Sequence, residues 1–216
     1  MSEGDDSGNL PSTYDLSSVF AAKDSREVAE LYDHWADDYE QSILSWGYLT
    51  PAVTSWFVGR FVEDRGAPVL DAGAGTGLMG DVLATLGYSD LVAIDISENM
   101  LAHARGKGVY RQTGRMELGQ ELDFPTGAFA AVVATGVFAA GHAPPESLDE
   151  LARVTRNGGS VIFSVRTDVL EDTFGATLER LEEEGRWERL DETRPFSHLP
   201  LEDPELKLQV FAYRVR

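Results

Sequence analysis

Glycines that follow a short apolar run are the residues with the clearest potential for chemistry. The segment Val69–Gly77 reads Val-Leu-Asp-Ala-Gly-Ala-Gly-Thr-Gly, with glycine at every second position after Ala72. Glycines there let the backbone approach a ligand closely, and the N-terminus of a following helix offers unpaired N–H donors. Twenty residues beyond Gly75, Asp95 ends a second apolar run, where a carboxylate can accept both hydroxyls of a ribose. The pattern predicts a nucleotide-like cofactor between a glycine loop and an acidic side chain.

Two classes of cofactor fit this spacing. The segment Gly75–Gly80 also reads Gly-x-Gly-x-x-Gly, which is a fingerprint of dinucleotide-binding loops. Its register is poor for a dinucleotide, because residues 71–74 separate the strand from the first glycine of the fingerprint. Asp71 would also face a pyrophosphate, whereas a cationic ligand would tolerate that carboxylate. A tight turn without any ligand is the remaining interpretation, and Asp95 argues against it.

The elements that position these residues follow from apolar periodicity. Residues 25–43 carry one apolar stripe at helical spacing, and a second helix is expected from Pro51 to about residue 64, with Thr50 as its N-cap. After Pro68, apolar runs alternate with helical segments, which indicates a parallel sheet covered on both faces. We expect strands at 68–71, 91–95, 109–112, 129–135 and 160–165, helices at 97–104, 145–155 and 168–184, and an antiparallel pair at 187–196 and 207–215.

The predicted fold class is α/β, a doubly wound, Rossmann-like and mostly parallel sheet of seven strands whose last strand is antiparallel. Helices cover both faces, and N-terminal helices form a lid. We expect residues 1–20 to be a flexible acidic segment and residues 21–216 to be one domain. Within that domain, residues 25–66 cover the site, 67–166 hold the cofactor, and 167–216 add a C-terminal helix and the antiparallel pair.

Composition excludes several classes of function. The chain has 37 Asp and Glu against 18 Lys and Arg, a net charge of −19, which argues against binding to nucleic acid. Cysteine is absent, so disulfides and thiolate catalysis are excluded. No apolar run reaches the roughly 18 residues of a membrane span, and the acidic N-terminus is unlike a signal peptide. We expect a cytoplasmic monomer or homodimer with a small-molecule substrate and no nucleic-acid or membrane partner.

Several motifs in order resemble the class I S-adenosylmethionine-dependent methyltransferases. The likeness covers residues 28–165, and Val69–Gly77 resembles motif I of that family. Tyr32–Tyr39 resembles the aromatic-rich helix that covers the cofactor in small-molecule methyltransferases, although such a stripe can also simply pack on the sheet. Residues 110–196 resemble the branch named after the Williams–Beuren syndrome chromosome region. The resemblance implies S-adenosylmethionine as cofactor, S-adenosylhomocysteine as its product, and in-line methyl transfer to a small-molecule nucleophile.

The resemblance also implies cofactor contacts, residue by residue. Asp95 matches the acidic residue that binds the ribose hydroxyls, and Met100 matches a residue that packs on adenine. Glu117 and Leu118 resemble the acidic and apolar pair at the adenine edge, where the family usually has the shorter Asp. Ala130 replaces the usual Asp of a Phe-Asp motif, so one common contact is missing. The predicted cofactor-binding residues are Tyr32, Trp35, Tyr39, Asp71, Gly73, Ala74, Gly75, Gly77, Asp95, Ile96, Met100, Glu117, Leu118, Thr135 and Gly136.

The catalytic demand is small, because a sulfonium methyl is already a strong electrophile. The protein must align a nucleophile, exclude water and handle one proton. His142, after the fourth strand, and His34, at the edge of the aromatic stripe, are candidates for the proton, although a lone surface histidine is more often solvated. His34 and Asp38 are four residues apart, but two ligands do not make a metal site, and we predict none. The predicted substrate-binding residues are Val137, Phe138 and Arg166.

Two other functions stay open. A non-catalytic relative that binds the cofactor and regulates a partner is compatible with the acidic composition and the missing Phe-Asp motif. A nicotinamide-dependent oxidoreductase would use the Gly-x-Gly-x-x-Gly pattern. The chain has no Tyr-x-x-x-Lys pair and little length for a substrate domain, which argues against the oxidoreductase.

Overall fold

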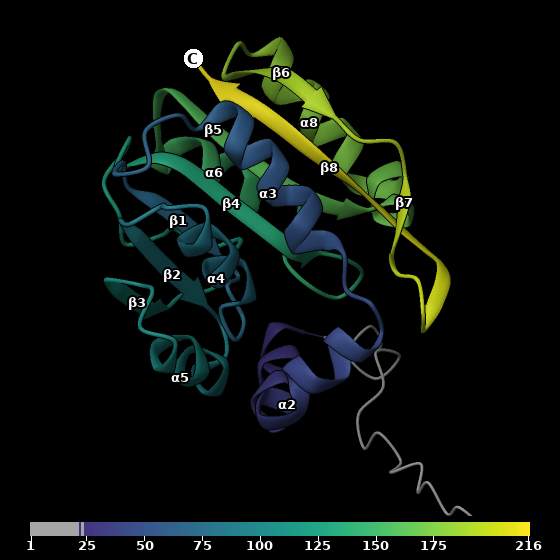
Figure 1. The fold of residues 1–216 in the computed structure, drawn as a ribbon. Coiled ribbons are helices and arrows are strands. Elements are labelled where there is room, and N and C mark those ends of the chain that lie inside the picture. Colours follow the sequence, from purple (N-terminus) through teal and green to yellow (C-terminus); the bar gives the residue numbers. More distant parts are fainter. Residues whose placement is uncertain (1–21, 23) are drawn as a thin grey trace, which may run out of the picture.

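The computed structural model describes residues 22 and 24–216 (Figure 1). The predicted flexible segment, residues 1–20, lies outside them. Helix α2 (Ser25–Ser45) begins after Asp24, whose side chain accepts a hydrogen bond from the backbone N–H of Glu27. The helix thus has the side-chain N-cap that stabilises a first turn. Its range agrees with the apolar stripe predicted for residues 25–43.

Helix α3 (Thr50–Phe61) differs from its prediction at the first residue. Leu49 is the N-cap and makes no side-chain capping bond, while Thr50 is already helical and buried. The predicted N-cap at Thr50 is therefore wrong. Pro51 stands in the first turn, where its missing N–H leaves no helical hydrogen bond unmade.

The described strands form an eight-stranded sheet with the order β3-β2-β1-β4-β5-β8-β6, and β7 pairs with β8 outside that path. Strands β1 to β5 pair in parallel, and β8 is antiparallel to β5, β6 and β7. The predicted α/β class with an antiparallel last strand is confirmed, whereas the predicted number of seven strands is wrong, because the described sheet also contains β7. The bounds are β1 Val69–Ala72, β2 Leu91–Asp95, β3 Gln112–Arg115, β4 Phe129–Phe138, β5 Thr155–Arg166, β6 Trp187–Glu192, β7 Phe196–Leu199 and β8 Asp203–Val215.

Helices cover both faces of the sheet (Figure 1). One apolar core joins the strands to α6 and α8 through side chains such as Leu151 and Leu178, and a second joins them to α3 and α4 through Phe57 and Leu83. Alternating strand residues feed the two cores, as expected for a sheet buried on both sides. The remaining helices are α4 Leu78–Thr85, α5 Glu98–Gly106, α6 Ser147–Val154, α7 Thr167–Val169, the π-helix η1 Leu170–Phe174 and α8 Gly175–Glu183.

Strands β4, β5 and β8 are longer than predicted, and three further elements are displaced or divided. The third strand lies at Gln112–Arg115 rather than 109–112, and it is short with no fully buried residue, so its apolar signal is weak. The helix predicted over 168–184 is divided by the π-helical turn, whose last residue, Phe174, contacts Phe138 with ring centroids 5.0 Å apart. The strand predicted over 187–196 is split into β6 and β7, because Pro195 lacks the N–H that a continuous ladder requires.

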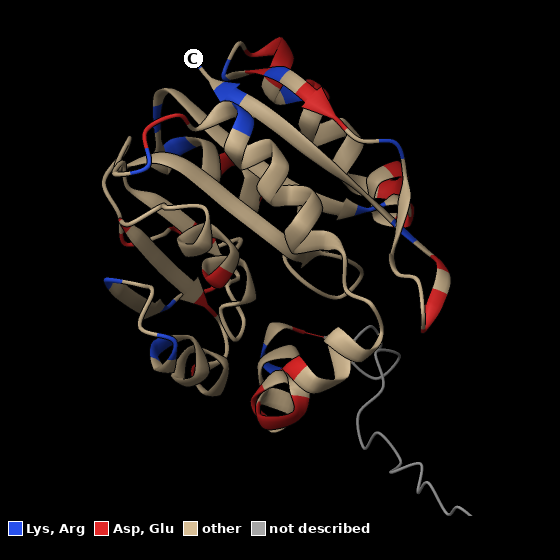
Figure 2. Cartoon of the chain, in the orientation of Figure 1, with Lys and Arg blue, Asp and Glu red and all other residues tan. Residues whose placement is uncertain are grey.

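Charge is unevenly placed on this framework. Figure 2 shows acidic residues along α2 and toward the end of the sheet that holds β6, with few Lys and Arg on α2. Every helix within residues 22 and 24–216 is too short or too polar to cross a bilayer. In that same part of the chain, no three His, Asp or Glu side chains are grouped as metal ligands.

Candidate active site

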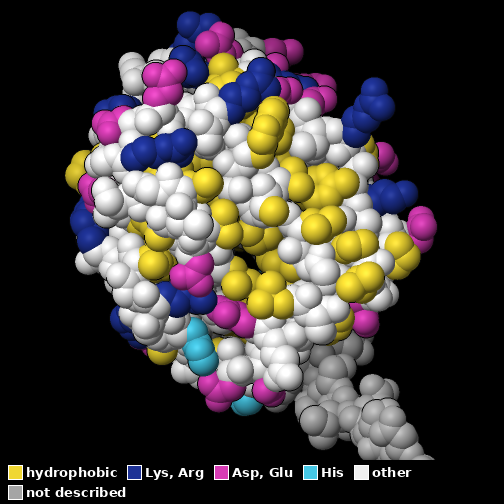
Figure 3. Space-filling view, viewed as in Figure 1, with side chains coloured by type: hydrophobic (Ala, Val, Ile, Leu, Met, Phe, Trp, Pro, Cys, Tyr) yellow, Lys and Arg dark blue, Asp and Glu magenta, His cyan; other side chains and the backbone are white. Residues whose placement is uncertain are grey.

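A cavity opens at the carboxyl ends of β1, β2 and β4, where α2 lies beyond the strands (Figure 1). Figure 3 shows a hollow bordered by hydrophobic side chains near the middle of this face of the molecule. This is the edge at which open α/β sheets bind ligands. The predicted cofactor residues that line the cavity are Tyr32, Tyr39, Asp71, Gly73, Ala74, Gly75, Asp95, Ile96, Met100, Glu117, Leu118, Thr135 and Gly136.

Two glycines of the loop after β1 border the cavity. Gly73 has φ +75°, and a Cβ at this position would lie 2.5 Å from a methyl carbon of Val137, so another residue would be strained and would clash. Gly75 has φ +55° and donates its N–H to Asp95 Oδ2 at 2.8 Å. The loop thus ties the end of β1 to the end of β2.

The other two glycines of the dinucleotide-like pattern do not face the cavity. Gly77 is the N-cap of α4 with φ +89°, and its Cα packs near Lys107 and Tyr110. Gly80 leaves the space that the Tyr110 ring occupies, and any Cβ there would overlap the Tyr110 hydroxyl. The pattern is explained by packing, and the predicted cofactor contact of Gly77 is not supported.

Asp95 is held in one orientation by the backbone. Its Oδ2 accepts the N–H of Gly75, and its Oδ1 accepts the N–H of Ser97 at 2.9 Å. Burial raises the pKa of Asp95, while these backbone hydrogen bonds act to lower it. Each carboxylate oxygen has a second lone pair, so this side chain can still accept hydroxyl groups from a ligand.

Asp71, at the end of β1, is buried and only half satisfied. Tyr110 donates its hydroxyl hydrogen to Asp71 Oδ2 at 2.5 Å, whereas Oδ1 has no hydrogen-bond partner among the described residues. Burial raises the pKa of Asp71 to about 7, against the hydrogen bond from Tyr110. The hydroxyl oxygens of Thr76 and Thr135, also on the cavity wall, have no partner within the described chain either.

The unpartnered oxygen atoms on the cavity wall indicate whether S-adenosylmethionine, the implied cofactor, fits the site. Buried polar groups are normally hydrogen-bonded, so unsatisfied acceptors around one cavity indicate a ligand that donates hydrogen bonds. The carboxylates of Asp71 and Asp95 favour a ligand with positive charge and with hydroxyl groups. S-adenosylmethionine carries an ammonium group, a sulfonium and a ribose diol, and the residues present fit it. A pyrophosphate would meet the buried carboxyl group of Asp71 and the partly buried carboxyl group of Asp95.

The aromatic helix α2 contributes to the cavity wall with two of its three predicted residues. Tyr32 and Tyr39 line the cavity. Trp35 is 1 % exposed and lies behind them, with ring centroids 4.9 Å from Tyr39 and 5.7 Å from Trp46. Its predicted contact with the cofactor is therefore not supported. Trp35 instead packs as a buried side chain against neighbouring aromatic rings.

Helix α2 is attached to α5 through a polar seam that the sequence did not reveal. Asp33 Oδ1 accepts hydrogen bonds from Ser97 Oγ at 2.5 Å and from the backbone N–H of Asn99 at 3.0 Å. Farther along the helix, Lys107 binds Glu40 at 2.9 Å, and His103 binds Asp37 at 3.0 Å. Ser97, which caps α5 as predicted, thereby also contacts the helix that lines the cavity.

His142 faces the cavity and forms a defined chain of hydrogen bonds. Its Nδ1 lies 2.9 Å from the carbonyl oxygen of Ala140, which can only accept, so Nδ1 donates. Its Nε2 lies 3.0 Å from the hydroxyl oxygen of Tyr32, which donates to it in the neutral tautomer. Burial lowers the pKa of His142, so the ring is neutral near pH 7.

His34 lies elsewhere. It is exposed, its Nδ1 donates to the carbonyl oxygen of Glu30 at 2.6 Å, and it does not line the cavity. The structure therefore gives no support to the predicted catalytic role of His34, or to a shared metal ligand role with Asp38.

The predicted substrate residues divide between two neighbouring cavities. Val137 lines the cavity described above, whereas Phe138 and Arg166 line a second, smaller one behind Tyr32 and His142. The walls of the second cavity include Tyr48, Ser164 and His198, which the sequence did not single out.

Gly136 stands between the two cavities and is required there. It has φ +76°, and a Cβ at this position would lie 2.6 Å from the Tyr48 hydroxyl oxygen. Its N–H donates to Ser164 Oγ at 2.8 Å. The spacing of the sequence offers no signal for this contact, because Tyr48, Gly136 and Ser164 come from separate elements.

Known proteins share both the sequence pattern and the fold. A family model described as a methyltransferase domain matches residues 70–163. The human methyltransferase-like protein 27 is 33 % identical over 196 residues, which are 86 % of this chain and 79 % of that protein. The phosphatidylethanolamine N-methyltransferase of Cereibacter sphaeroides is 38 % identical over 111 residues, 47 % of this chain and 52 % of the relative.

A solved structure shows the same fold at low identity. The crystal structure of the [4+2]-cyclase SpnF superposes with a TM-score of 0.70 and 16 % identity, covering 90 % of this chain and 97 % of the cyclase. The structure of a possible histamine N-methyltransferase from Thermotoga maritima gives a TM-score of 0.62 at 16 % identity, covering 87 % and 99 %.

Proposed function

This chain belongs to the family of S-adenosylmethionine-dependent methyltransferases, and from that premise we propose that it methylates a small-molecule nucleophile by in-line displacement. The observation that carries the proposal is the position of the Tyr32–His142 pair. It faces the same cavity as Asp71, Asp95 and the glycine loop. A proton acceptor and a set of cofactor contacts thus share one enclosed space.

The residues that would hold the cofactor come from the ends of β1, β2, β3 and β4 and from α5. Asp95 and Asp71 would accept its hydroxyl and ammonium groups, Met100 and Leu118 would pack on its base, and Glu117 would accept from the base edge. Thr135 and the loop at residues 73–75 would complete the wall. When bound, S-adenosylmethionine supplies an electrophilic methyl group on a sulfonium centre.

His142 would remove the proton of the acceptor. Because Nδ1 donates to the carbonyl of Ala140, the lone pair of the neutral ring is on Nε2, on the side of Tyr32. Since the Tyr32 hydroxyl already donates to that lone pair, the two residues would act as a relay: the hydroxyl oxygen would take the proton that the acceptor loses, and its own hydrogen would pass to Nε2. The same hydrogen bond would orient the imidazole ring.

Helix α2 would act as the lid that excludes water. Tyr32 and Tyr39 of this helix line the cavity, and its polar seam with α5 fixes the helix beyond the strand ends. We propose residues 25–66 as the cover, 67–166 as the cofactor-binding core and 167–216 as the C-terminal helix and antiparallel pair. Enclosure by this cover favours a small substrate over a polymer.

The acidic composition supports a substrate that is neither a nucleic acid nor part of a membrane. A net charge of −19 disfavours the phosphate backbone of nucleic acids and anionic membrane surfaces. We propose a cytoplasmic monomer or homodimer that acts on a diffusible molecule. A particular relation to the Williams–Beuren branch stays a prediction, carried by the likeness of residues 110–196.

Calorimetric titration tests the proposal first. We expect micromolar binding of S-adenosylhomocysteine and no binding of a nicotinamide dinucleotide. Incubation with radiolabelled S-adenosylmethionine and a panel of small phenols, amines and acids should then transfer label to an acceptor. Cofactor binding without transfer to any member would instead favour the non-catalytic regulator, and nicotinamide binding would favour the oxidoreductase.

A further inference from the structure

The second cavity lies directly behind the proposed proton acceptor. It shares Tyr32, Tyr39, Tyr48, Gly136 and His142 with the first cavity, so these residues form a common wall. Its volume is about 40 Å³, room for about three water molecules, or for the carbon and two oxygens of a carboxylate. A molecule placed here would occupy it with one small polar group and extend toward the first cavity.

His198 on β7 is an unexplained buried polar group in this cavity. Its side chain belongs to a residue that is 8 % exposed, and neither Nδ1 nor Nε2 has a hydrogen-bond partner among the described residues. Burial lowers the pKa of His198 to about 4, so the ring is neutral and presents one donor and one acceptor. A buried imidazole without partners is unfavourable unless a ligand supplies them.

Arg166 at the end of β5 brings positive charge to the same cavity. Its side chain is only 14 % exposed, and Asp168 fixes the guanidinium by accepting from Nε at 3.1 Å and Nη2 at 2.6 Å. Arg166 is the single Lys or Arg among the described residues that line either cavity. Its charge also helps to keep both His142 and His198 unprotonated.

Apolar side chains form much of the remaining wall, namely Ile43, Phe138, Ala139 and Leu208. Ser164 Oγ, also on this wall, accepts the N–H of Gly136. A ligand that matches this wall has one negatively charged group for Arg166 and His198, and an apolar body. A cationic amine would instead lose its hydration next to the buried guanidinium.

We propose that this second cavity is the acceptor subsite and that it binds the carboxylate of a small, largely apolar acid through Arg166 and His198. The assignment as acceptor subsite rests on the proposed methyltransferase function, whereas the preference for a carboxylate rests on the cavity alone. The nucleophilic group of the acid would then stand on the His142 side of the common wall.

Matched acids and amides test the preference. The protein is titrated with acid–amide pairs graded in size from butyrate and butyramide, through 4-hydroxybenzoate and 4-hydroxybenzamide, to indole-3-acetate and its amide. Each titration is run with and without saturating S-adenosylhomocysteine. We expect at least one acid to bind about tenfold or more tightly than its amide, because a charge-assisted hydrogen bond is lost with the amide. The ring nitrogen signals of His198 should shift on binding of that acid.

Variants assign the preference to the cavity. Arg166→Gln should abolish the difference between acid and amide while leaving the affinity for S-adenosylhomocysteine unchanged. Arg216→Gln, which removes the same charge from an exposed pair with Glu188, should leave the difference intact. His198→Asn keeps a polar group and should weaken acid binding by a smaller factor, which provides a second test if Arg166→Gln does not fold.

Two results would overturn the subsite. One is equal binding of acid and amide for every pair, and the other is a preference that survives both Arg166→Gln and His198→Asn. Failure of the proposed function is distinguishable, because S-adenosylhomocysteine would then not bind while the acid preference persisted in its absence.

Discussion

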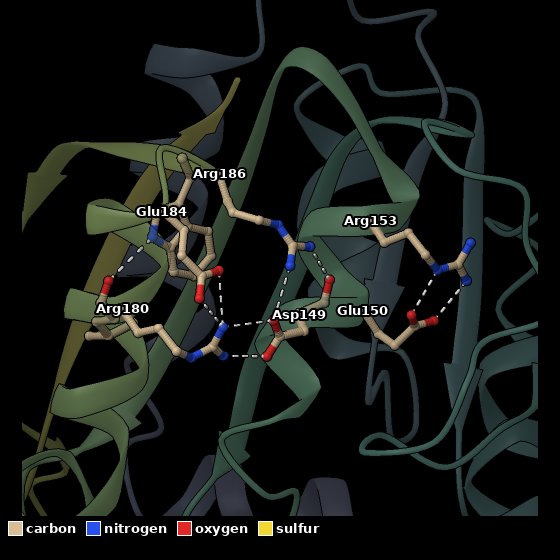
Figure 4. Close-up of polar contacts among 8 residues, drawn as sticks. Asp149, Glu150, Arg153, Arg180, Glu184 and Arg186 are labelled. Atoms are coloured by element: carbon tan, nitrogen blue, oxygen red, sulfur yellow. Dashed lines mark hydrogen bonds and ion pairs between the residues drawn. The ribbon is translucent and has the colours of Figure 1, made fainter.

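The polar cluster between α6 and α8 differs from the two cavities at the strand ends in how its polar groups are paired. In the cluster, Asp149 binds both Arg180 and Arg186, and Glu150 binds Arg153 (Figure 4). Among the described residues, Asp71 Oδ1 in the first cavity and both ring nitrogens of His198 in the second have no hydrogen-bond partner.

The difference distinguishes polar groups that stabilise the fold from polar groups that would bind a ligand. The cluster is partly exposed and its charges are mutually satisfied, so it joins α6, α8 and the start of β6 without needing any further group. The cavity groups are buried and unsatisfied, which costs stability in the isolated protein. Groups of this kind are expected where a ligand completes them. Substitutions in the two regions should therefore act on different quantities.

The largest effect is expected at His142. His142→Gln should reduce turnover of an identified acceptor by about 100-fold or more, because general base catalysis contributes about that factor. The affinity for S-adenosylhomocysteine should change little. His34→Gln is the matched control and should leave turnover intact. Loss of turnover in the control instead would move the catalytic role to α2.

The pH dependence of turnover is a second test of the role of His142. The base form of His142 is required, so turnover should rise with pH and then level off. Because its pKa is lowered by burial, the acidic limb should lie below about pH 6.5. A limb above pH 7 would contradict the role of His142.

The next effect is expected at Asp95. Asp95→Ala should weaken the binding of S-adenosylhomocysteine by about 100-fold, since hydrogen bonds to a charged acceptor contribute about 1.5–3 kcal/mol each. Calorimetric titration measures the change. Asp149→Ala removes the same charge from the paired cluster and should bind as the unmodified protein does. Equal losses for both variants would remove the distinction between the regions.

His198 is expected to make stability depend on pH. With a pKa of about 4 in the folded state and about 6.5 in the unfolded state, the folded state binds fewer protons between these values. The free energy of unfolding is therefore unaffected by this titration above about pH 6.5. It decreases as pH falls, because the unfolded chain takes up a proton that the buried ring does not, and the loss is about 2–3 kcal/mol at pH 4.5. Urea unfolding at pH 7 and 4.5 should show a smaller loss for His198→Phe than for the unmodified chain. An unchanged loss would contradict burial of a neutral ring.

The smallest effect is expected in the cluster itself. Asp149→Ala should lower the free energy of unfolding by about 1 kcal/mol, because its arginine partners are more than a third exposed and solvent screens the pairs. Glu184→Ala, which removes only a helical pair with Arg180, should cost about 0.3 kcal/mol. Denaturant unfolding measures both. A loss of unfolding free energy above the roughly 2–5 kcal/mol of a large-to-small core substitution would show that the cluster is a main source of stability.

Regular elements were predictable where apolar periodicity is strong. Helix α2 and strands β1 and β2 lie close to their predicted positions, because buried faces impose a period that the sequence repeats. Strand β3 lies three residues beyond its predicted position, since none of its residues is fully buried and it has little apolar signal. The π-helical turn at Leu170–Phe174 has no apolar period of its own in the sequence, so periodicity does not predict it.

The sequence by itself determined the fold class, the glycine loop and Asp95, because these depend on residues close together in the chain. Only the tertiary structure decided the pairs Tyr32–His142 and Tyr110–Asp71, which are separated by 110 and 39 positions. It also decided that Gly77 and Gly80 serve packing, and that His198 and Arg166 share a cavity. Local spacing fixes which residues one turn presents, whereas contacts between elements depend on how side chains fill the space between them.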